Sequence, residues 1–387
     1  MTSGALALER AAAPIDRLRR LLLQQALRIP SLSEWLVRRD RRVTLLAVGH
    51  ALVAFTLAAT FPMLLFVLGP VLLGVLHVAA DVRYLVLRRA LPAWWKHVVW
   101  IACASLIAFR IFQETGARGI VLARAEHAFV CVWILLGLIA GAVKRHSERR
   151  AARATGANPW DELVPSGGRA FLALPVLGAL AWFSWVEPGW TRLVFVHLHN
   201  LIAVGLWLWL FRSSRRAALI PLAVIFGAAA VLFFAHPWQL TESVGGLSAM
   251  GLHFAVAAEW VAPGFRWEHS YGLLYSYVFL QSVHYSAWLL LIPQDDVARE
   301  APTPFRTSVR SAFADFGPLG IALVAMAALA VVAAAFFGAT RARNVYLSLS
   351  MFHSYLELTI AAYFFAWGGK ALAGRRESSK SALAAPA

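Results

Sequence analysis

The chain has 387 residues, of which 60% are hydrophobic, 12% aromatic and 14% charged, and its mean hydropathy is +0.65. Soluble domains carry about 25% charged residues, so this composition excludes an ordinary cytosolic enzyme, a disordered chain and a coiled coil. The net charge of +16 comes from basic residues placed between apolar segments, which fits cytoplasmic loops better than nucleic-acid binding. The composition therefore predicts an all-α, polytopic transmembrane protein.

Residues 1–42 are expected to form a basic N-terminal arm ahead of the first apolar segment. Nine arginines lie between residues 9 and 42, with short apolar stretches at 21–23 and 35–37 between them. Such a mixture is typical of an amphipathic helix that lies on an anionic leaflet, so we expect anionic lipids to be partners of the arm. The arm lacks the short apolar run and cleavage site of a signal peptide, and none is expected.

Ten segments approach the roughly 20 apolar residues that a membrane span needs. We expect spans near residues 43–60, 62–87, 94–113, 120–143, 170–186, 190–211, 217–236, 270–292, 316–339 and 344–367.

The basic loops between these segments predict the orientation. They all fall on one side if the spans alternate, with Arg341 and Arg343 as the exceptions. The positive-inside rule then places both termini in the cytoplasm, as in a bacterial inner-membrane protein. We expect residues 43–368 to form a single helical domain, residues 369–387 to be a disordered tail, and Leu247–Val261 to form a short helix in the outer segment 237–269.

Six of the 12 histidines lie within the expected spans. The alternating topology places them on five helices at similar depth, near the bilayer midplane. Polar groups without partners cost several kcal/mol there, so we expect these imidazoles to face one another or a shared ion. Neutral imidazole suits iron, copper or zinc. The six are His50, His77, His197, His199, His284 and His353.

Two carboxylates accompany the histidines at helical spacing. Asp81 follows His77 by four residues, and Glu357 follows His353 by four, so each pair shares one helix face. A ligating imidazole usually donates its other N–H to a carboxylate or carbonyl, so we expect both acids to orient ligands, with direct ligation as an alternative.

The spacing of His197 and His199 allows only one of them to join a shared ion. They differ by about 200° around a helix. His199 is the deeper of the two and is favoured as the ligand. We therefore predict a mononuclear metal site formed by His77, His199, His284 and His353, with His197 and His50 as alternates.

Four short motifs resemble those of a known family. The stretch GVLHVAAD at residues 74–81 resembles the G-x-P-H-G-x-x-D signature of the Brp/Blh family, which are membrane-embedded, iron-dependent β-carotene dioxygenases. Residues 196–200, 281–285 and 352–357 are similar to the later histidine helices of that family and come in the same order. The resemblance covers roughly residues 62–368.

This resemblance implies non-haem Fe(II), O2 and a lipophilic polyene as substrate, most plausibly a carotenoid cleaved to retinal-type aldehydes. Asp81, Glu357 and Tyr285 are then the candidate catalytic residues. The family has a second histidine four residues after the one on its third helix, where this chain has Trp288. His199 or His50 is therefore expected to complete the ligand set.

Two interpretations that do not involve an oxygenase stay open, although an oxidoreductase is favoured. Imidazoles on separate helices could hold haem b by two axial histidines, in a protein that moves electrons across the membrane. A polytopic transporter with a polar site at the midplane is the other alternative, although the inverted repeats typical of transporters are not evident.

Overall fold

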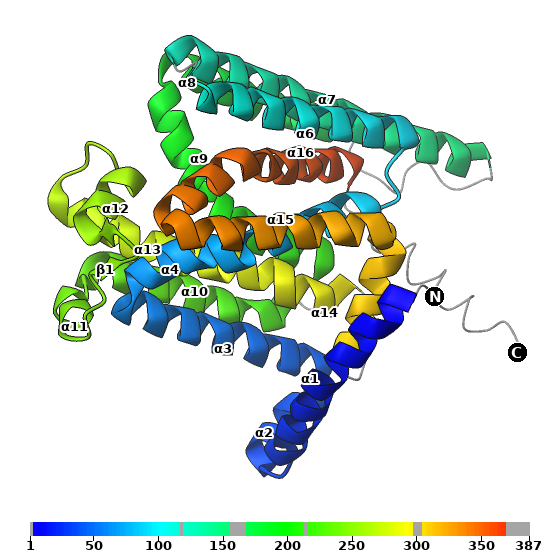
Figure 1. Ribbon diagram of the computed structural model, residues 1–387. Coiled ribbons are helices and arrows are strands. Elements are labelled where there is room, and N and C mark those ends of the chain that lie inside the picture. The colour runs from blue at the N-terminus through cyan, green and yellow to red at the C-terminus, as the bar shows by residue number, and fades with distance from the viewer. Residues whose placement is uncertain (1–2, 117–118, 155–167, 213–214, 297–303, 369–387) are drawn as a thin grey trace, which may run out of the picture. The chain divides into compact units, whose positions relative to one another are not determined.

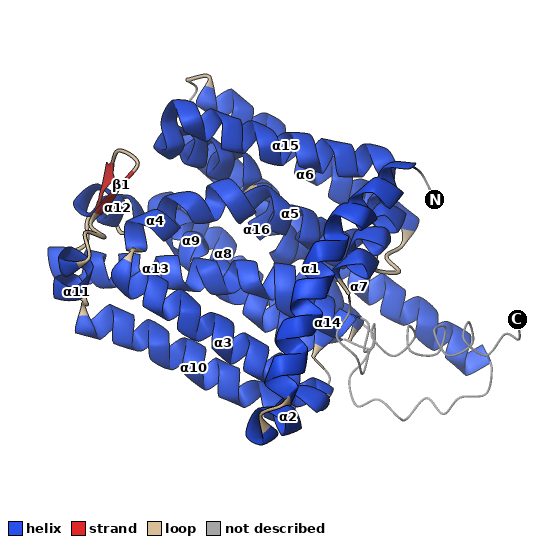
Figure 2. Cartoon of the chain, turned by 60° about the horizontal axis from the view of Figure 1, so that its bottom comes forward, coloured by secondary structure: helices blue, strands red, loops and turns tan. Residues whose placement is uncertain are grey.

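The computed structural model describes residues 3–116, 119–154, 168–212, 215–296 and 304–368, so the expected tail at 369–387 lies outside the described residues. Almost all described residues are helical, which confirms the all-α fold class (Figure 2). The α-helices are α1 (Ser3–Leu27), α2 (Pro30–Val37), α3 (Arg39–Thr60), α4 (Pro62–Leu68), α5 (Gly74–Asp81), α6 (Ala93–Glu114), α7 (Ile120–Ala154), α8 (Gly168–Val186), α9 (Pro188–Leu206), α10 (Arg215–Ala235), α11 (Trp238–Ser243), α12 (Phe254–Val261), α13 (Trp267–Ser286), α14 (Ile292–Asp296), α15 (Phe305–Ser350) and α16 (Phe352–Trp367). The π-helices are η1 (Gly69–Leu73), η2 (Val82–Leu87), η4 (Trp207–Phe211) and η5 (Ala287–Leu291), and the strands are β1 (Ser248–Ala249) and β2 (Leu252–His253).

Eight helical segments in the described part of the chain are long and apolar enough to cross a membrane, and the protein is accordingly an integral membrane protein. Seven of them coincide with the expected spans between residues 43 and 236, and the eighth, Phe305–Trp367, contains the expected spans 316–339 and 344–367. The remaining expected span, 270–292, is helical as α13 and η5, but its serines, glutamine and histidine make it less apolar. The number ten and the side of the termini stay predictions.

Backbone contacts divide the chain into two compact units, which are described separately. Unit 1 comprises Met1–Arg88 and Ala203–Leu347, and unit 2 comprises Arg89–Ile202 and Ser348–Ala387. One division follows η2, and the other two fall inside α9 and α15. The expected single domain at 43–368 includes parts of both units and stays a prediction.

The centre of unit 1 is formed by α3, α10 and α13, which pack side by side (Figure 1). α3 turns small side chains inward at steps of three and four residues, because Ala47, Ala51, Ala54 and Ala58 are each at most 6% exposed. Small residues at this spacing let the backbones of membrane helices approach closely. The alanine pattern of the first span therefore selects its packing face.

A buried ion network joins α14 to the other helices of unit 1. The Asp295 carboxylate accepts hydrogen bonds from the guanidinium of Arg39 and, at 2.8 Å, from the indole Nε1 of Trp207. Arg212 lies 3.4 Å from the same carboxylate and donates to the Asp40 carbonyl at 2.9 Å. These groups satisfy one another, which a buried charge requires.

The segment 237–269 corrects one expectation. The sequence predicts a helix around Leu247–Val261, but its first half is the hairpin β1–β2, and the helix begins only at Phe254. The two loop residues have positive φ angles, 52° at Met250 and 77° at Gly251. Two consecutive positive φ angles are typical of a tight type I′ hairpin turn, and an α-helix cannot contain them.

α15 explains the exceptional position of Arg343. Non-helical backbone at Gly317 and Gly338 interrupts this helix. Both breaks fall within the expected span 316–339, one residue from each of its ends. Arg343 is 1% exposed, and its guanidinium lies between the rings of Phe66 and Trp260, at 3.5 and 4.4 Å from their centroids. Arg343 is therefore a buried charged residue that connects segments of unit 1, and it does not belong to a basic loop.

Unit 2 is built on the packing of α7 against α16, with α6 and α8 beside them. α7 contains Gly137 and Gly141, which form a GxxxG motif. A Cβ atom at either glycine would collide with the backbone of α16. The motif therefore lets the two helices approach at backbone distance, as GxxxG motifs do in other membrane proteins.

Candidate metal centre

Two histidines of unit 2 meet between α9 and α16. The Nε2 atoms of His199 and His353 are 3.1 Å apart, and the ring planes are nearly perpendicular, at 79°. His353 is 4% exposed, and the His199 side chain is 13% exposed. α9 is a regular α-helix through this region, so His197 points elsewhere, and His199 is the residue that reaches His353.

Both rings are oriented through their other nitrogen. Nδ1 of His199 lies 3.2 Å from Oε2 of Glu357, a carboxylate that is 0% exposed. Nδ1 of His353 donates to the carbonyl oxygen of Ser350, one turn earlier. A nitrogen that donates a hydrogen bond carries the proton in a neutral imidazole. His353 therefore presents the lone pair of its Nε2 toward Nε2 of His199, which in one tautomer donates a hydrogen bond to it and in the other presents a second lone pair.

This arrangement fits a cation. A proton shared by the two Nε2 atoms forms a hydrogen bond at 3.1 Å, and a metal ion bound by both nitrogens would occupy the same position. Two nitrogen ligands at about 2.1 Å from one ion are separated by about 3.0–3.4 Å in octahedral or tetrahedral geometry. The separation in unit 2 lies in this range. The Ser350 carbonyl provides His353 with the outer hydrogen bond that metal-ligating histidines usually make, and the Glu357 carboxylate lies close to Nδ1 of His199.

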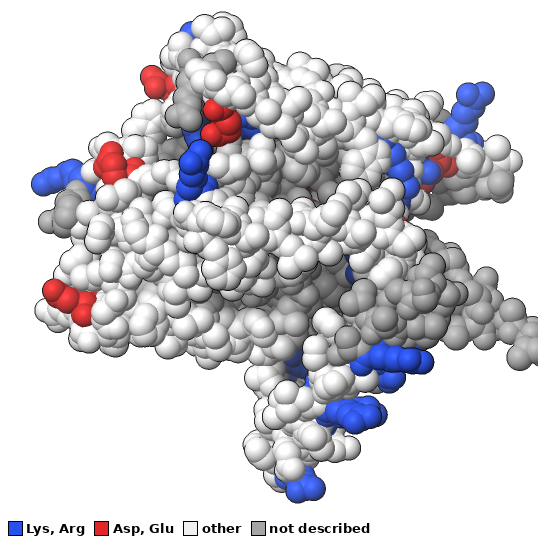
Figure 3. Space-filling view, in the orientation of Figure 1, with Lys and Arg blue, Asp and Glu red and all other residues white. Residues whose placement is uncertain are grey.

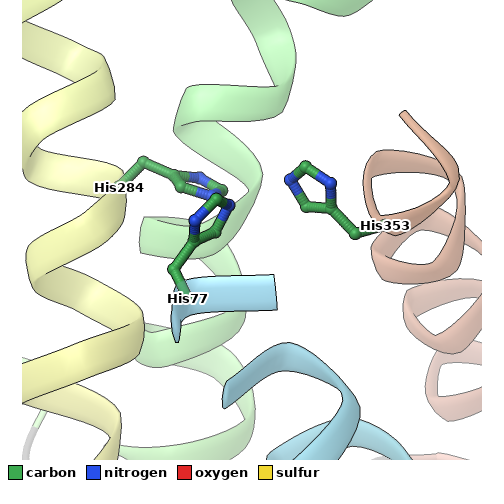
Figure 4. A group of neighbouring side chains, drawn as sticks. All are labelled: His77, His284 and His353. Atoms are coloured by element: carbon green, nitrogen blue, oxygen red, sulfur yellow. The ribbon is translucent and has the colours of Figure 1, made fainter. Parts of the chain in front are cut away.

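Unit 1 carries a second histidine pair, on α5 and α13. The ring centroids of His77 and His284 are 5.1 Å apart, and the ring planes meet edge to face at 81°. Figure 4 shows the two rings next to each other. A ring nitrogen of one lies within 4.8 Å of a ring nitrogen of the other, and both residues are at most 2% exposed. Nδ1 of His77 lies 3.4 Å from the Leu73 carbonyl, in position to donate a hydrogen bond to it. Tyr285 packs against His77, with ring centroids 4.5 Å apart.

Irregular helix turns surround this second pair. α5 is flanked by η1 and η2, and η5 begins three residues after His284. A π-turn inserts one residue into a helix and rotates the side chains that follow, and such turns occur often at functional sites. Asp81, the last residue of α5, is 0% exposed one turn after His77, and Trp288 is 0% exposed in η5.

Two of the predicted site residues lie apart from these pairs. His50 is on an exposed part of α3, where its Nδ1 lies 3.0 Å from the Leu46 carbonyl of its own helix. His197 is half-buried on α9. Within unit 1, the structure brings together His77, His284 and Tyr285. Within unit 2, it brings together His199, His353 and Glu357.

Sequence reasoning missed a buried polar group that anchors α16. Glu126 accepts hydrogen bonds from the guanidinium of Arg110 and, at 3.1 Å, from the hydroxyl of Tyr355. Both charged residues are at most 6% exposed, so the arginine that interrupts the third apolar segment is neutralised inside unit 2. An arginine and a glutamate in consecutive spans are the signal that could have predicted this pair.

Comparison of the chain with family models, with curated proteins and with solved structures gives no match in any of the three.

Proposed function

We propose that the protein is a membrane-embedded oxygenase with histidine-ligated non-haem iron. The observation that carries the proposal is the His199–His353 pair, with Nε2 atoms 3.1 Å apart and each Nδ1 close to an oxygen atom. Such a pair suits two adjacent ligands of one ion. Neutral imidazoles keep the ion cationic and leave coordination positions open, which suits oxygen activation better than a closed structural site.

The roles of the chain's residues follow from this pair. His199 and His353 would hold the iron through Nε2, and Glu357 is proposed to accept a hydrogen bond from Nδ1 of His199 and so to set its tautomer. The proposal retains His77 and His284 as further ligands, which rests on the depth of these residues in the predicted spans. Asp81 is proposed to orient His77. Iron, when bound, supplies the activation of O2, and the apolar helices exclude water and admit lipophilic molecules.

The proposed substrate is a carotenoid dissolved in the bilayer. Adding one O2 across a central double bond and cleaving that bond gives two aldehydes, so the atoms balance without another reductant. Tyr285, which packs on His77, and Trp288, one turn from His284, are proposed to line the polyene path. This assignment derives from the family resemblance of the four histidine motifs.

Haem b is the less favoured cofactor for the unit 2 pair. Two axial imidazoles on opposite faces of a haem place their Nε2 atoms about 4 Å apart, with the iron between them. The separation of His199 and His353 is 3.1 Å. The visible spectrum distinguishes the two cofactors, because a reduced haem protein gives an α-band.

The proposal includes the topology from the sequence: ten spans, both termini in the cytoplasm, and the bacterial inner membrane as the location. The eight apolar segments support a polytopic protein, and the basic loops support the orientation.

Elemental analysis of the purified protein, together with its visible spectrum, tests the metal. We expect one iron per chain without a haem band, and loss of iron when any of the four histidines is replaced by alanine. Glu357→Gln and Asp81→Asn should weaken metal affinity by about 10–100-fold. His146→Ala is the matched control, because His146 is an exposed histidine at the basic end of α7. Stoichiometric iron in His353→Ala or His77→Ala would refute the assignment, and two iron ions per chain would show separate sites.

Expression in carotene-accumulating bacteria tests the reaction. We expect colour loss together with aldehyde products in cells that carry the wild-type chain, and neither in cells that carry His353→Ala. Unchanged carotene beside iron-loaded wild-type protein would exclude this substrate.

A further inference from the structure

The N-terminal helix α1 turns an apolar stripe outward. The stripe consists of Ile15, Leu18, Leu21 and Leu22, which are 52, 59, 57 and 62% exposed. Steps of three and four residues place these side chains on one helix face. Four large aliphatic side chains on one exposed face are unusual for a helix that faces water.

The opposite face of α1 is fixed to the beginning of α15. Asp16 is 4% exposed, and its carboxylate accepts hydrogen bonds from the backbone N–H groups of Phe305 and Arg306, at 2.6 and 3.2 Å. The Arg306 side chain also donates to it, at 3.3 Å. A carboxylate that caps a helix N-terminus is held by both hydrogen bonds and the helix dipole. The Asp16 carboxylate therefore faces the beginning of α15, and the apolar stripe lies on the other side of α1.

Arginines border the stripe. Arg17 and Arg19 project about 100° to either side of Leu18 on a helical wheel, and several basic side chains stand out on the otherwise white surface of the α1–α2 segment (Figure 3). In α2, Trp35 is 38% exposed and lies under the guanidinium of Arg41, 5.7 Å from the ring centroid. An apolar stripe between arginines matches the boundary of an anionic bilayer, where leucines enter the acyl edge and guanidinium groups reach phosphates.

We infer that α1 and α2 bind the surface of an anionic bilayer, with Asp16 setting the rotation of α1 so that the stripe faces the lipid. The chain supplies this membrane itself, because the first candidate span, Arg39–Thr60, begins two residues after α2 ends. The basic charge of the arm selects anionic headgroups over a second copy of this chain, whose net charge is +16.

Spin labels on the full-length protein in nanodiscs test the inference. The label is placed at Leu18→Cys in the stripe, or at Gln24→Cys as the matched control, with Cys103 and Cys131 replaced by alanine. Gln24 is exposed and projects about 120° away from Leu18. The measurement compares collisions of the label with oxygen, which enters the bilayer, and with a water-soluble nickel chelate.

In nanodiscs of phosphatidylcholine with phosphatidylglycerol, we expect a ratio of oxygen to nickel collisions several-fold higher at position 18 than at position 24. The difference should shrink in phosphatidylcholine alone and at high salt. Arg17→Gln and Arg19→Gln should each weaken the bound state about fivefold. Asp16→Ala should bring the two positions together, because α1 is then able to rotate.

Three results would overturn the inference. The first is equal exposure of positions 18 and 24 to the nickel chelate in anionic nanodiscs. The second is protection of position 18 that ignores lipid charge and requires two copies per nanodisc, which would indicate a protein partner. The third is an unchanged difference between the two positions in Asp16→Ala, which would refute the role of Asp16.

Discussion

Replacing Gly141 by alanine should separate α7 from α16. A Cβ atom at Gly141 would lie 2.2 Å from the carbonyl oxygen of Tyr363 and 3.0 Å from the Cβ of Ala366. Carbon and oxygen atoms approach to about 3.3 Å without strong repulsion, so the α16 backbone has to move by about 1 Å. The obstructing atom is backbone, and a change of rotamer cannot relieve the clash.

The energetic and functional consequences can be worked from this displacement. Overpacking of this kind costs about 1–3 kcal/mol, and the better helix propensity of alanine returns at most about 1 kcal/mol. α16 carries His353 and Glu357, which contact His199 at 3.1 and 3.2 Å. A movement of about 1 Å is large compared with the few tenths of an ångström over which a hydrogen bond weakens, so it disturbs both contacts. We therefore expect Gly141→Ala to lower both stability and iron retention.

The matched control is Gly178→Ala on α8, because a Cβ atom there meets nothing within 4 Å. Thermal unfolding in detergent should show a melting temperature several degrees lower for Gly141→Ala and an unchanged or higher one for Gly178→Ala. Iron content per chain should fall only in Gly141→Ala. Equal melting temperatures for the two variants would refute the reasoning, because the close approach of α7 and α16 would then be dispensable.

Three further predictions address unit 1 and the topology. Asp295→Asn should destabilise the protein by about 3–5 kcal/mol, because it leaves Arg39 and Arg212 buried without their carboxylate. In thermal unfolding in detergent, Asp40→Asn is the control and should have little effect, because the Asp40 side chain is half-exposed. Burial raises the pKa of Asp16, but hydrogen bonds from the Phe305 and Arg306 amides outweigh it, so the folded pKa is lowered. The docking of α1 is then fully stable above pH about 4 and is lost as the pH falls through the folded pKa. The mobility of a spin label at position 18 should report this loss, and in Asp16→Asn the same label should be mobile at every pH. Reporter fusions at Gly116, Glu187 and Gln239 should give signals from the outer side. A cytoplasmic signal from any of the three would refute the predicted topology.

The sequence by itself determined the helical segments and the different directions of His197 and His199 on their helix. A membrane span depends on the apolar character of about 20 consecutive residues, and the relative direction of two side chains on one helix depends only on their spacing. Both are local properties. The expected spans between residues 43 and 236 accordingly match helices of the structure within a few residues. The exception is α7, whose candidate span Ile120–Ala151 ends eight residues after the expected span 120–143.

Only the tertiary structure decided which polar groups meet. Spacing relates Glu357 to His353 on the same helix, but the carboxylate contacts His199 on α9. In the same way, the guanidinium of Arg343 contacts the rings of Phe66 and Trp260. Contacts between helices depend on the rotation and depth of each helix, which close packing at residues such as Gly141 and irregular turns such as η1 and η5 set together. None of these is encoded in the spacing within a single segment, so the partner of each buried charge emerges only when the helices pack.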